Sequence, residues 1–235
     1  FTPLAEKLAA TFWPGPLTLV LPKKPDCPVA SLATAGLDTI AIRYPAHPAM
    51  RDLIGASGKP LAAPSANASG KISPTTAQHV MVSLSGRIPM ILDAGPCSKG
   101  LESTIVAPGT DDIQLLRPGP ITAEEIEAAI GVLADINQDN KISAPGQLAS
   151  HYAPEKPVQL NAYARDSDAY LIGFGTMACD YNLSPSSSLV EAAARLFDAL
   201  HSADASAATE IHIAPVPYEG LGIAINDRLK RAAAR

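Results

Sequence analysis

The chain has 235 residues, of which 47% are hydrophobic and 17% are charged, and its formal net charge is -5. This apolar content supports one large domain or two modest ones and excludes disorder as the main state. The apolar runs fall far short of the ~20 residues of a membrane-spanning helix, so we expect no membrane association. The acidic balance argues against strong direct nucleic-acid binding through bulk charge.

In chain order, the first two thirds alternate short apolar runs with proline and glycine breakers. This pattern predicts helices at residues 3–11, 47–56, 75–84 and 122–131. It predicts strands at residues 17–21, 39–43, 61–63, 90–92, 103–107 and 113–116. The last of these helices has the clearest start, because Thr122 suits an N-cap and Glu124 and Glu125 follow in the first turn.

Residues 143–157 are rich in proline and glycine and lack periodicity, which is typical of a linker. The pattern then changes to a strand at 169–174, a helix at 188–202, a strand at 209–214 and a helix at 221–235. This alternation predicts a small parallel α/β unit. We therefore predict an α/β domain at 1–143, a linker or lid at 144–157 and a C-terminal α/β domain at 158–235. The glycine turn after residue 174 could suit a nucleotide, but one such turn is weak evidence.

The loop at residues 62–75 carries the strongest chemical signal. It follows a predicted strand, contains four hydroxyl residues together with Asn67, Gly70 and Lys71, and then enters a helix. Small side chains, hydroxyl donors and a helix N-terminus are favourable for binding phosphate. An ordinary polar loop that caps the helix explains the same residues, and the loop does not match a Walker motif.

Two further stretches place polar groups beside apolar strands. Arg43 ends the predicted strand at 39–43, where a fixed guanidinium could bind a carboxylate with two hydrogen bonds. Thr39 lies four residues earlier and therefore on the same strand face. An arginine that binds only loop carbonyls is the alternative, and His47 is better explained as a helix-start residue than as a catalytic base.

The adjacent His151 and Tyr152 lie inside the proline-rich linker. They could belong to a lid in which Tyr152 stacks on a ligand and His151 forms a hydrogen bond. A spacer whose tyrosine only packs is the alternative. The sequence has no Gly-x-Ser-x-Gly elbow and no His-Glu-x-x-His motif, and its three cysteines are far apart. We therefore predict no acid–base residue, no nucleophile and no metal ligand from the protein, and a reducing, cytoplasmic location.

Five motifs occur together and in one order, at residues 12–18, 43–48, 63–70, 102–105 and 116–119. With the segments at 145–154 and 220–229, the chain resembles the long, two-domain branch of the YrdC-like threonylcarbamoyl-AMP synthases over almost its whole length. The resemblance implies a twisted mixed sheet with helices, followed by a smaller Rossmann-like parallel α/β domain.

The resemblance also implies an enzyme, a nucleotidyltransferase that makes L-threonylcarbamoyladenylate and pyrophosphate from L-threonine, bicarbonate and ATP. Mg²⁺ would accompany the ATP, with no protein ligand predicted. The product would pass to the tRNA threonylcarbamoyl-transfer complex, which modifies adenosine 37. Such a reaction needs placement and charge neutralisation more than a general base, which agrees with the missing triad.

By resemblance, three residues would line the threonine pocket, namely Arg43, Ala63 through its backbone, and Ser103. Seven residues would contact or support ATP, namely Thr39, Ser65, Asn67, Ser73, Arg117, Tyr152 and His151.

The sequence departs from the family pattern at its start. The roughly 60–70 residues that carry an early Thr-containing strand and a Lys-x-Arg region are not in this sequence, and Lys7, Lys23 and Lys24 stand in the wrong context to replace them. We expect this polypeptide by itself to be inactive or very weak, because each lost charge-assisted phosphate contact is worth about 1.5–3 kcal/mol.

Two other functions stay open from the residues. One is an RNA-binding or translation-associated module, against which the acidic balance and the lack of interleaved basic and aromatic residues argue. The other is carbamoyl-AMP formation in hydrogenase maturation, which would require acylphosphatase and zinc-finger segments that this sequence does not show.

Overall fold

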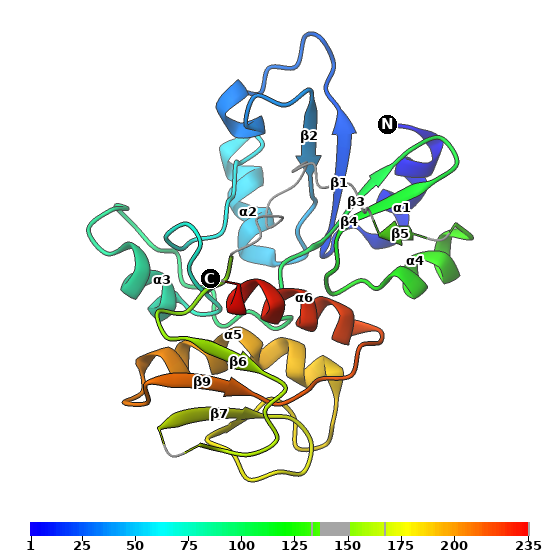
Figure 1. Cartoon of the computed structure of the whole chain (residues 1–235). Coiled ribbons are helices and arrows are strands. Elements are labelled where there is room, and N and C mark those ends of the chain that lie inside the picture. The colour runs from blue at the N-terminus through cyan, green and yellow to red at the C-terminus, as the bar shows by residue number, and fades with distance from the viewer. Residues whose placement is uncertain (133, 137–150, 167, 235) are drawn as a thin grey trace. The chain divides into compact units, whose positions relative to one another are not determined.

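The computed structural model describes residues 1–132, 134–136, 151–166 and 168–234 (Figure 1). The chain forms two compact units. Unit 1 comprises Phe1–Pro64 and Glu102–Gln147, and unit 2 comprises Ser65–Leu101 and Leu148–Arg235. Much of the predicted linker, residues 144–150, lies outside the described residues.

Unit 1 is built on a five-stranded sheet with the order β2-β1-β3-β4-β5 (Figure 1). Its strands are β1 (Leu17–Pro22), β2 (Thr39–Ile42), β3 (Thr104–Pro108), β4 (Ile113–Arg117) and β5 (Ala134–Ile136). The β1–β2 and β3–β4 pairs are antiparallel, whereas the β1–β3 and β4–β5 pairs are parallel. The predicted mixed sheet is therefore confirmed.

The helices of unit 1 are α1 (Pro3–Phe12), α2 (Pro48–Ser57) and α4 (Ala123–Ile130), with a short 3₁₀ helix η1 at Ser31–Thr34. Residues 17, 19 and 21 of β1 pack in one apolar cluster with Leu8 of α1 and Ile126 of α4. Val20 belongs to a second cluster, with Ile105 and Leu116. The alternation along β1 thus gives the sheet two buried faces, as period-2 side-chain geometry requires.

Unit 2 has a four-stranded parallel sheet with the order β6-β9-β7-β8. Its strands are β6 (Val158–Leu160), β7 (Ala169–Gly173), β8 (Tyr181–Asn182) and β9 (Glu210–Ile213), and its helices are α3 (Ala77–Leu84), α5 (Leu189–Ala205) and α6 (Leu221–Ala233). Leu196 of α5, Ile225 of α6 and Ile211 of β9 share one core cluster. This confirms the predicted parallel C-terminal α/β unit.

Residues 72 and 101 connect the middle of the chain to that core. Ile72 and Leu101 are 5% and 8% exposed and pack in the same cluster as α5 and α6. The contacts therefore group the hydroxyl-rich loop with the C-terminal sheet.

Two predicted strands are wrong. Residues 61–63 and 90–92 are irregular and largely exposed. Neither segment pairs with a strand in the part of the chain that the structure describes, and strand propensity is not realised without a ladder partner. Three short strands, β5, β6 and β8, were not predicted, because two or three residues are too few to show a period.

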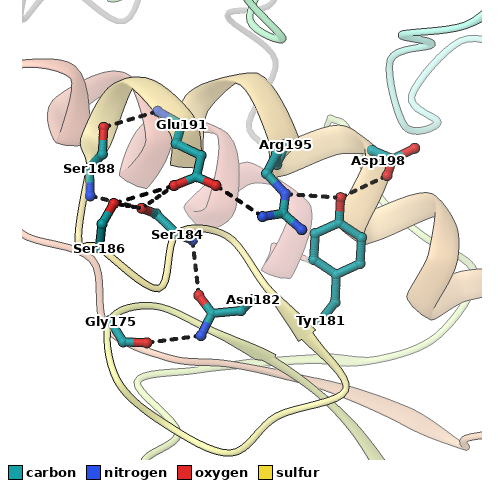
Figure 2. Close-up of polar contacts among 9 residues, drawn as sticks. All are labelled: Gly175, Tyr181, Asn182, Ser184, Ser186, Ser188, Glu191, Arg195 and Asp198. Carbon is teal, nitrogen blue, oxygen red and sulfur yellow. Dashed lines mark hydrogen bonds and ion pairs between the residues drawn. The ribbon is translucent and has the colours of Figure 1, made fainter.

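Figure 2 shows the start of α5 together with Gly175 of the turn after β7, and in the chain β8 lies between this turn and α5. The Ser188 hydroxyl accepts a hydrogen bond from the Glu191 N–H, and the Ser184 hydroxyl donates to the Glu191 carboxylate at 2.6 Å. That hydrogen bond is the largest of the influences that lower the pKa of Glu191. A carboxylate thus stands where the N-terminus of α5 would stabilise a phosphate, which argues against a phosphate site at the start of this helix.

Among the described residues, no helix is both long enough and apolar enough to cross a membrane.

Candidate active site

Backbone hydrogen bonds bring three of the sequence motifs together within unit 1. The Gly15 N–H donates to the Tyr44 carbonyl at 2.9 Å, which joins the motif at 12–18 to the motif at 43–48. The Thr104 N–H donates to the Pro16 carbonyl at 2.9 Å, which adds the motif at 102–105. Segments that are far apart in sequence therefore meet around the start of β1.

A buried polar cluster connects these motifs to the motif at 116–119. Thr18, Ser103 and Arg117 are each less than 9% exposed. The Thr18 and Ser103 hydroxyl oxygens are 2.7 Å apart. The Arg117 guanidinium donates through Nη2 to the Ser103 carbonyl at 2.9 Å and to the Ser103 hydroxyl at 3.3 Å. The arrangement fixes one positive charge and two hydroxyls in one place, a combination that suits an anionic ligand.

The turn after β4 approaches this cluster closely at Gly119. A Cβ atom at Gly119 would lie 2.5 Å from the Thr104 nitrogen and 2.8 Å from the Glu102 carbonyl oxygen. Such distances are too short for any side chain, so the Leu-Arg-Pro-Gly sequence ends in glycine for a steric reason. The close approach holds β4 against the residues that precede β3, and thereby holds Arg117 against Ser103.

Arg43 follows the last residue of β2 and has an exposed side chain. The structure gives it no hydrogen bond or ion pair with any described residue, so its five donors are available to a ligand. Partial enclosure by the protein desolvates the guanidinium and lowers its pKa. Thr39 is half-buried at the start of the same strand, and Ala63 is exposed in the irregular segment that was predicted as a strand.

The remaining predicted ATP residues belong to unit 2. Ser65 is exposed, whereas Ser73 is buried. The Asn67 amide donates to the carbonyls of Ala68 and Lys71 at 3.0 and 2.9 Å. Asn67 thus stabilises the hydroxyl-rich loop from within, and its support of an ATP site stays a prediction.

The linker segment lies along this loop within unit 2. The Ala153 N–H donates to the Gly70 carbonyl at 2.9 Å, and Lys71 forms an ion pair with Glu155 at 3.2 Å. Tyr152 is 1% exposed, adopts a positive φ of 61° and packs in the core near Phe197. The position of Tyr152 therefore favours a packing role for this side chain, and nucleotide stacking stays a prediction.

His151 is half-buried, and its N–H donates to the Arg231 carbonyl at 3.2 Å. This bond anchors the linker segment to the end of α6. His47 stands at the N-cap of α2, as expected for a helix-start residue.

A histidine pair beside Ser73 was not predicted from the sequence. The rings of His79 and His201 stack with centroids 3.8 Å apart, and His201 Nε2 is 3.1 Å from the Ser73 carbonyl oxygen. Burial lowers the pKa of both imidazoles. The two histidines come from α3 and α5, which are distant in sequence, so no local motif identifies them.

The structure thus brings Ser103 and Arg117 into direct contact and places Thr39, Arg43 and Ala63 in the same unit. Ser65, Asn67, Ser73, His151 and Tyr152 lie in unit 2. The convergence of the two sets on one cavity stays a prediction.

Comparisons with known proteins cover both units. A family model described as "Telomere recombination" matches residues 1–119, and one described as "Threonylcarbamoyl-AMP synthase, C-terminal domain" matches residues 121–234. The chain is 41% identical to a threonylcarbamoyl-AMP synthase of Bacillus subtilis, covering 97% of this chain and 72% of that protein. A threonylcarbamoyl-AMP synthase of Pyrococcus abyssi is 39% identical, with 97% and 73% covered.

Solved structures agree with these matches. The crystal structure of P. abyssi Sua5 complexed with L-threonine has a TM-score of 0.86 and 37% identity, covering 97% of this chain and 73% of that chain. A P. abyssi Sua5 variant with a neighbouring histidine and tyrosine replaced by alanine has a TM-score of 0.88 and 36% identity, with 99% and 73% covered. With the motifs joined around β1, these matches show that the chain belongs to the threonylcarbamoyl-AMP synthase family, enzymes of the nucleotidyltransferase type that act in tRNA modification.

Proposed function

We propose that this protein joins L-threonine, bicarbonate and ATP into L-threonylcarbamoyladenylate, with release of pyrophosphate, for the modification of adenosine 37 in tRNA. The Arg117–Ser103–Thr18 cluster is the observation that carries the proposal. It sets a buried guanidinium and two hydroxyls at one end of the inner strands β1, β3 and β4, the end at which β2 leads into Arg43. The threonine bound in the P. abyssi relative supports the choice of amino acid.

The chemistry follows from charges that the reactants already carry. The threonine amine and bicarbonate form a carbamate as a C–N bond forms and water leaves, and the carbamate is an anion that needs no further base. A carbamate oxygen attacks the α-phosphorus of ATP, the new O–P bond forms, and the bond to the β-phosphate breaks as pyrophosphate leaves. The protein accelerates this step by positioning the reactants and by neutralising phosphate charge.

In this proposal Arg43 holds the threonine carboxylate, while the backbone of Ala63 and the side chain of Ser103 line the amino-acid pocket. The hydroxyls of Thr39, Ser65 and Ser73 and the guanidinium of Arg117 contact ATP. Asn67 supports the loop, and His151 and Tyr152 belong to the linker that covers the nucleotide.

Mg²⁺ would be carried by ATP in this proposal. The proposed ATP residues offer hydroxyl, amide, imidazole and guanidinium groups but no carboxylate. This donor set fits an ion held by phosphate oxygens and water, as Mg²⁺ commonly is, and not one held by the protein. We further propose a cytoplasmic enzyme that passes its product to the tRNA threonylcarbamoyl-transfer complex.

The decisive experiment measures pyrophosphate release with threonine, bicarbonate or ATP omitted in turn. We expect release only when all three are present. Release that continues without threonine would overturn the assignment of the amino-acid substrate. Release that continues without bicarbonate would overturn the carbamate step.

A further inference from the structure

The parallel sheet of unit 2 has a polar cluster at the start of its inner strand β9. Glu210 and His212 are two residues apart on β9, so their side chains project from the same face of the sheet. Ile211 and Ile213 point the other way, into the core formed with α5 and α6. The cluster therefore lies on the sheet face opposite that core.

His212 is unusual because its side chain is only 1% exposed. Neither ring nitrogen has a hydrogen-bond partner of acceptable geometry among the described residues. Leaving a buried polar atom unsatisfied costs about 1–3 kcal/mol, so a buried imidazole in this state calls for an explanation. Its Nε2 atom points to Glu210 and lies 3.1 Å from Oε1.

Asp166 completes the cluster from a separate segment. Its carboxylate, that of Glu210 and a ring nitrogen of His212 offer ligand atoms that all lie within 4.8 Å of one another. The segment is held at the start of β7, because the Ala169 N–H donates to the Asp166 carbonyl at 3.2 Å. Ala169 of β7 pairs with Glu210 of β9, which brings Asp166 to the same end of these two strands as Glu210.

We propose that Asp166, Glu210 and His212 bind one Zn²⁺ ion. Two ligands that each lie about 2.1 Å from one zinc ion are about 3.4 Å apart at a tetrahedral angle and about 3.0 Å apart at a right angle. The 3.1 Å between His212 Nε2 and Glu210 Oε1 falls in this interval. One imidazole nitrogen and two carboxylates form a donor set that Zn²⁺ accepts, whereas Mg²⁺ and Ca²⁺ prefer oxygen alone.

The charges of the cluster agree with a divalent cation. Two carboxylates and a neutral imidazole carry a charge of about -2, which one Zn²⁺ ion balances. Arg165, in the same segment as Asp166, is paired with Asp180 at 3.0 Å. The competing explanation is a protonated His212 that forms an ion pair with Glu210 and binds no metal.

The site would act as a clip within unit 2, independent of the proposed synthase reaction. It joins the segment that precedes β7 to the start of β9, two places that no covalent link connects directly. Because an ion of this kind binds the folded state and not the unfolded chain, it would raise the stability of unit 2.

The test titrates ZnCl₂ into the full chain after removal of metal by a chelator, with calorimetry as the readout. We expect one ion per chain with a Kd of about 1 μM or tighter. Asp166→Asn changes an exposed side chain and should weaken binding at least about tenfold without loss of fold. The matched control is Asp168→Asn, an exposed carboxylate outside the cluster, which should leave the affinity unchanged.

His212→Gln should abolish binding, and circular dichroism will show whether this buried variant folds. The Asp166→Asn result decides the matter if it does not. Absence of zinc binding by the unaltered chain would overturn the proposal, as would an equal loss in Asp166→Asn and Asp168→Asn. Substitution with Co²⁺ adds a second readout: thiolate-to-metal charge-transfer absorption would place the ion on cysteine and would also overturn the proposal.

Discussion

Two arginines of unit 1 differ in how far the fold has already engaged them. Arg117 is 8% exposed, and its guanidinium donates hydrogen bonds through Nε and Nη2 to the Ser103 carbonyl. Arg43 is exposed, and the structure gives its side chain no hydrogen bond or ion pair with a described residue. Arg117 therefore contributes to the fold as well as to the proposed site, whereas Arg43 can be changed at little cost to stability.

Replacing Arg43 by alanine tests the threonine pocket. We expect Arg43→Ala to raise the KM for threonine about 10- to 150-fold, because a bidentate charge-assisted pair is worth about 1.5–3 kcal/mol. The KM for ATP should change much less. Pyrophosphate release at varied concentrations of threonine and ATP measures both constants.

Arg87→Ala is the matched control, because Arg87 is also exposed and lies outside the predicted site residues. Arg117→Ala should show the reverse pattern, with a larger effect on ATP than on threonine. A rise in the KM for ATP alone in Arg43→Ala would contradict the assigned roles.

Gly119→Ala tests the close approach of the turn after β4. The added Cβ would lie 2.5 Å from the Thr104 nitrogen, which is backbone and cannot rotate away. We expect a loss of about 2 kcal/mol or more in the free energy of unfolding, as for other overpacked sites. Urea denaturation of the full chain measures this loss.

The control is Gly55→Ala, because a Cβ at Gly55 in α2 would meet nothing within 4 Å. There we expect a gain of up to about 1 kcal/mol from helix propensity. Equal effects of the two substitutions would show that Gly119 has no special steric role.

At the scale of elements, α4 shows how local sequence fixes a helix start. The Thr122 hydroxyl accepts from the Glu125 N–H at 3.2 Å, and the Glu125 carboxylate accepts from the Thr122 N–H at 2.7 Å. Both bonds involve residues three apart, so the sequence contains everything that the cap requires.

Thr122→Ala should therefore lower the free energy of unfolding by about 1 kcal/mol. Thermal and urea unfolding of the full chain measure the change. Thr110→Ala, at an exposed threonine whose side chain forms no hydrogen bond with a described residue, should change stability by less than about 0.5 kcal/mol. If both variants lose the same amount, the capping box does not stabilise the fold.

The longer elements were predictable for the same local reason. α1, α5 and α6 agree with the predicted helices to within about one turn, and β1, β3 and β7 agree to within one residue at each end. The elements that were not predicted are short strands, which form only because they pair with a neighbouring strand. β5 pairs with β4, and β6 pairs with β9. Each has three residues, which are too few to show the alternation that predicts a strand.

At the scale of the whole molecule, the stacked histidines predict how stability depends on pH. Burial lowers the pKa of His79 and His201 below 6.5, and Asp198 opposes this shift for both rings. Tyr181 donates a hydrogen bond to Asp198, and the charge of Asp204 also raises the pKa of His201. Below pH 6.5 the unfolded chain thus binds more protons at these sites than the folded chain does.

We therefore expect the free energy of unfolding to fall as the pH drops from 7 through 6.5 toward the folded-state pKa values. His201 alone can contribute at most about 1.4 kcal/mol per pH unit. Urea unfolding at a series of pH values measures the slope. His201→Gln keeps a donor for the Ser73 carbonyl and should reduce the slope, whereas His47→Gln, at the N-cap of α2, should not. A slope that His201→Gln leaves unchanged would contradict this origin.

The site was predictable to the extent that its residues stand in motifs. Arg43, Ser103 and Arg117 each end or adjoin an apolar strand, which is where exposed or binding groups are expected. Their partners were not predictable. The contact of Thr18 with Ser103 depends on the parallel pairing of β1 with β3, which brings residues from distant parts of the chain together.

The burial of Tyr152 was likewise not predictable from the sequence. In the sequence it is a tyrosine in a proline-rich linker, which suits a lid. In the fold it is buried against Phe197, and Ala153 beside it is hydrogen-bonded to Gly70. Burial depends on which segments surround a residue, and the sequence of a linker does not contain that information.

The sequence by itself determined the helices with caps, the longer strands, the parallel C-terminal unit and the motif residues, because these depend on side chains a few positions apart. The tertiary structure alone decided the Ser103–Arg117 contact, the histidine stack and the meeting of Asp166 with His212. Each of these joins strands, helices or loops that are distant along the chain. Their geometry follows from strand register and core packing, which are properties of the folded chain as a whole.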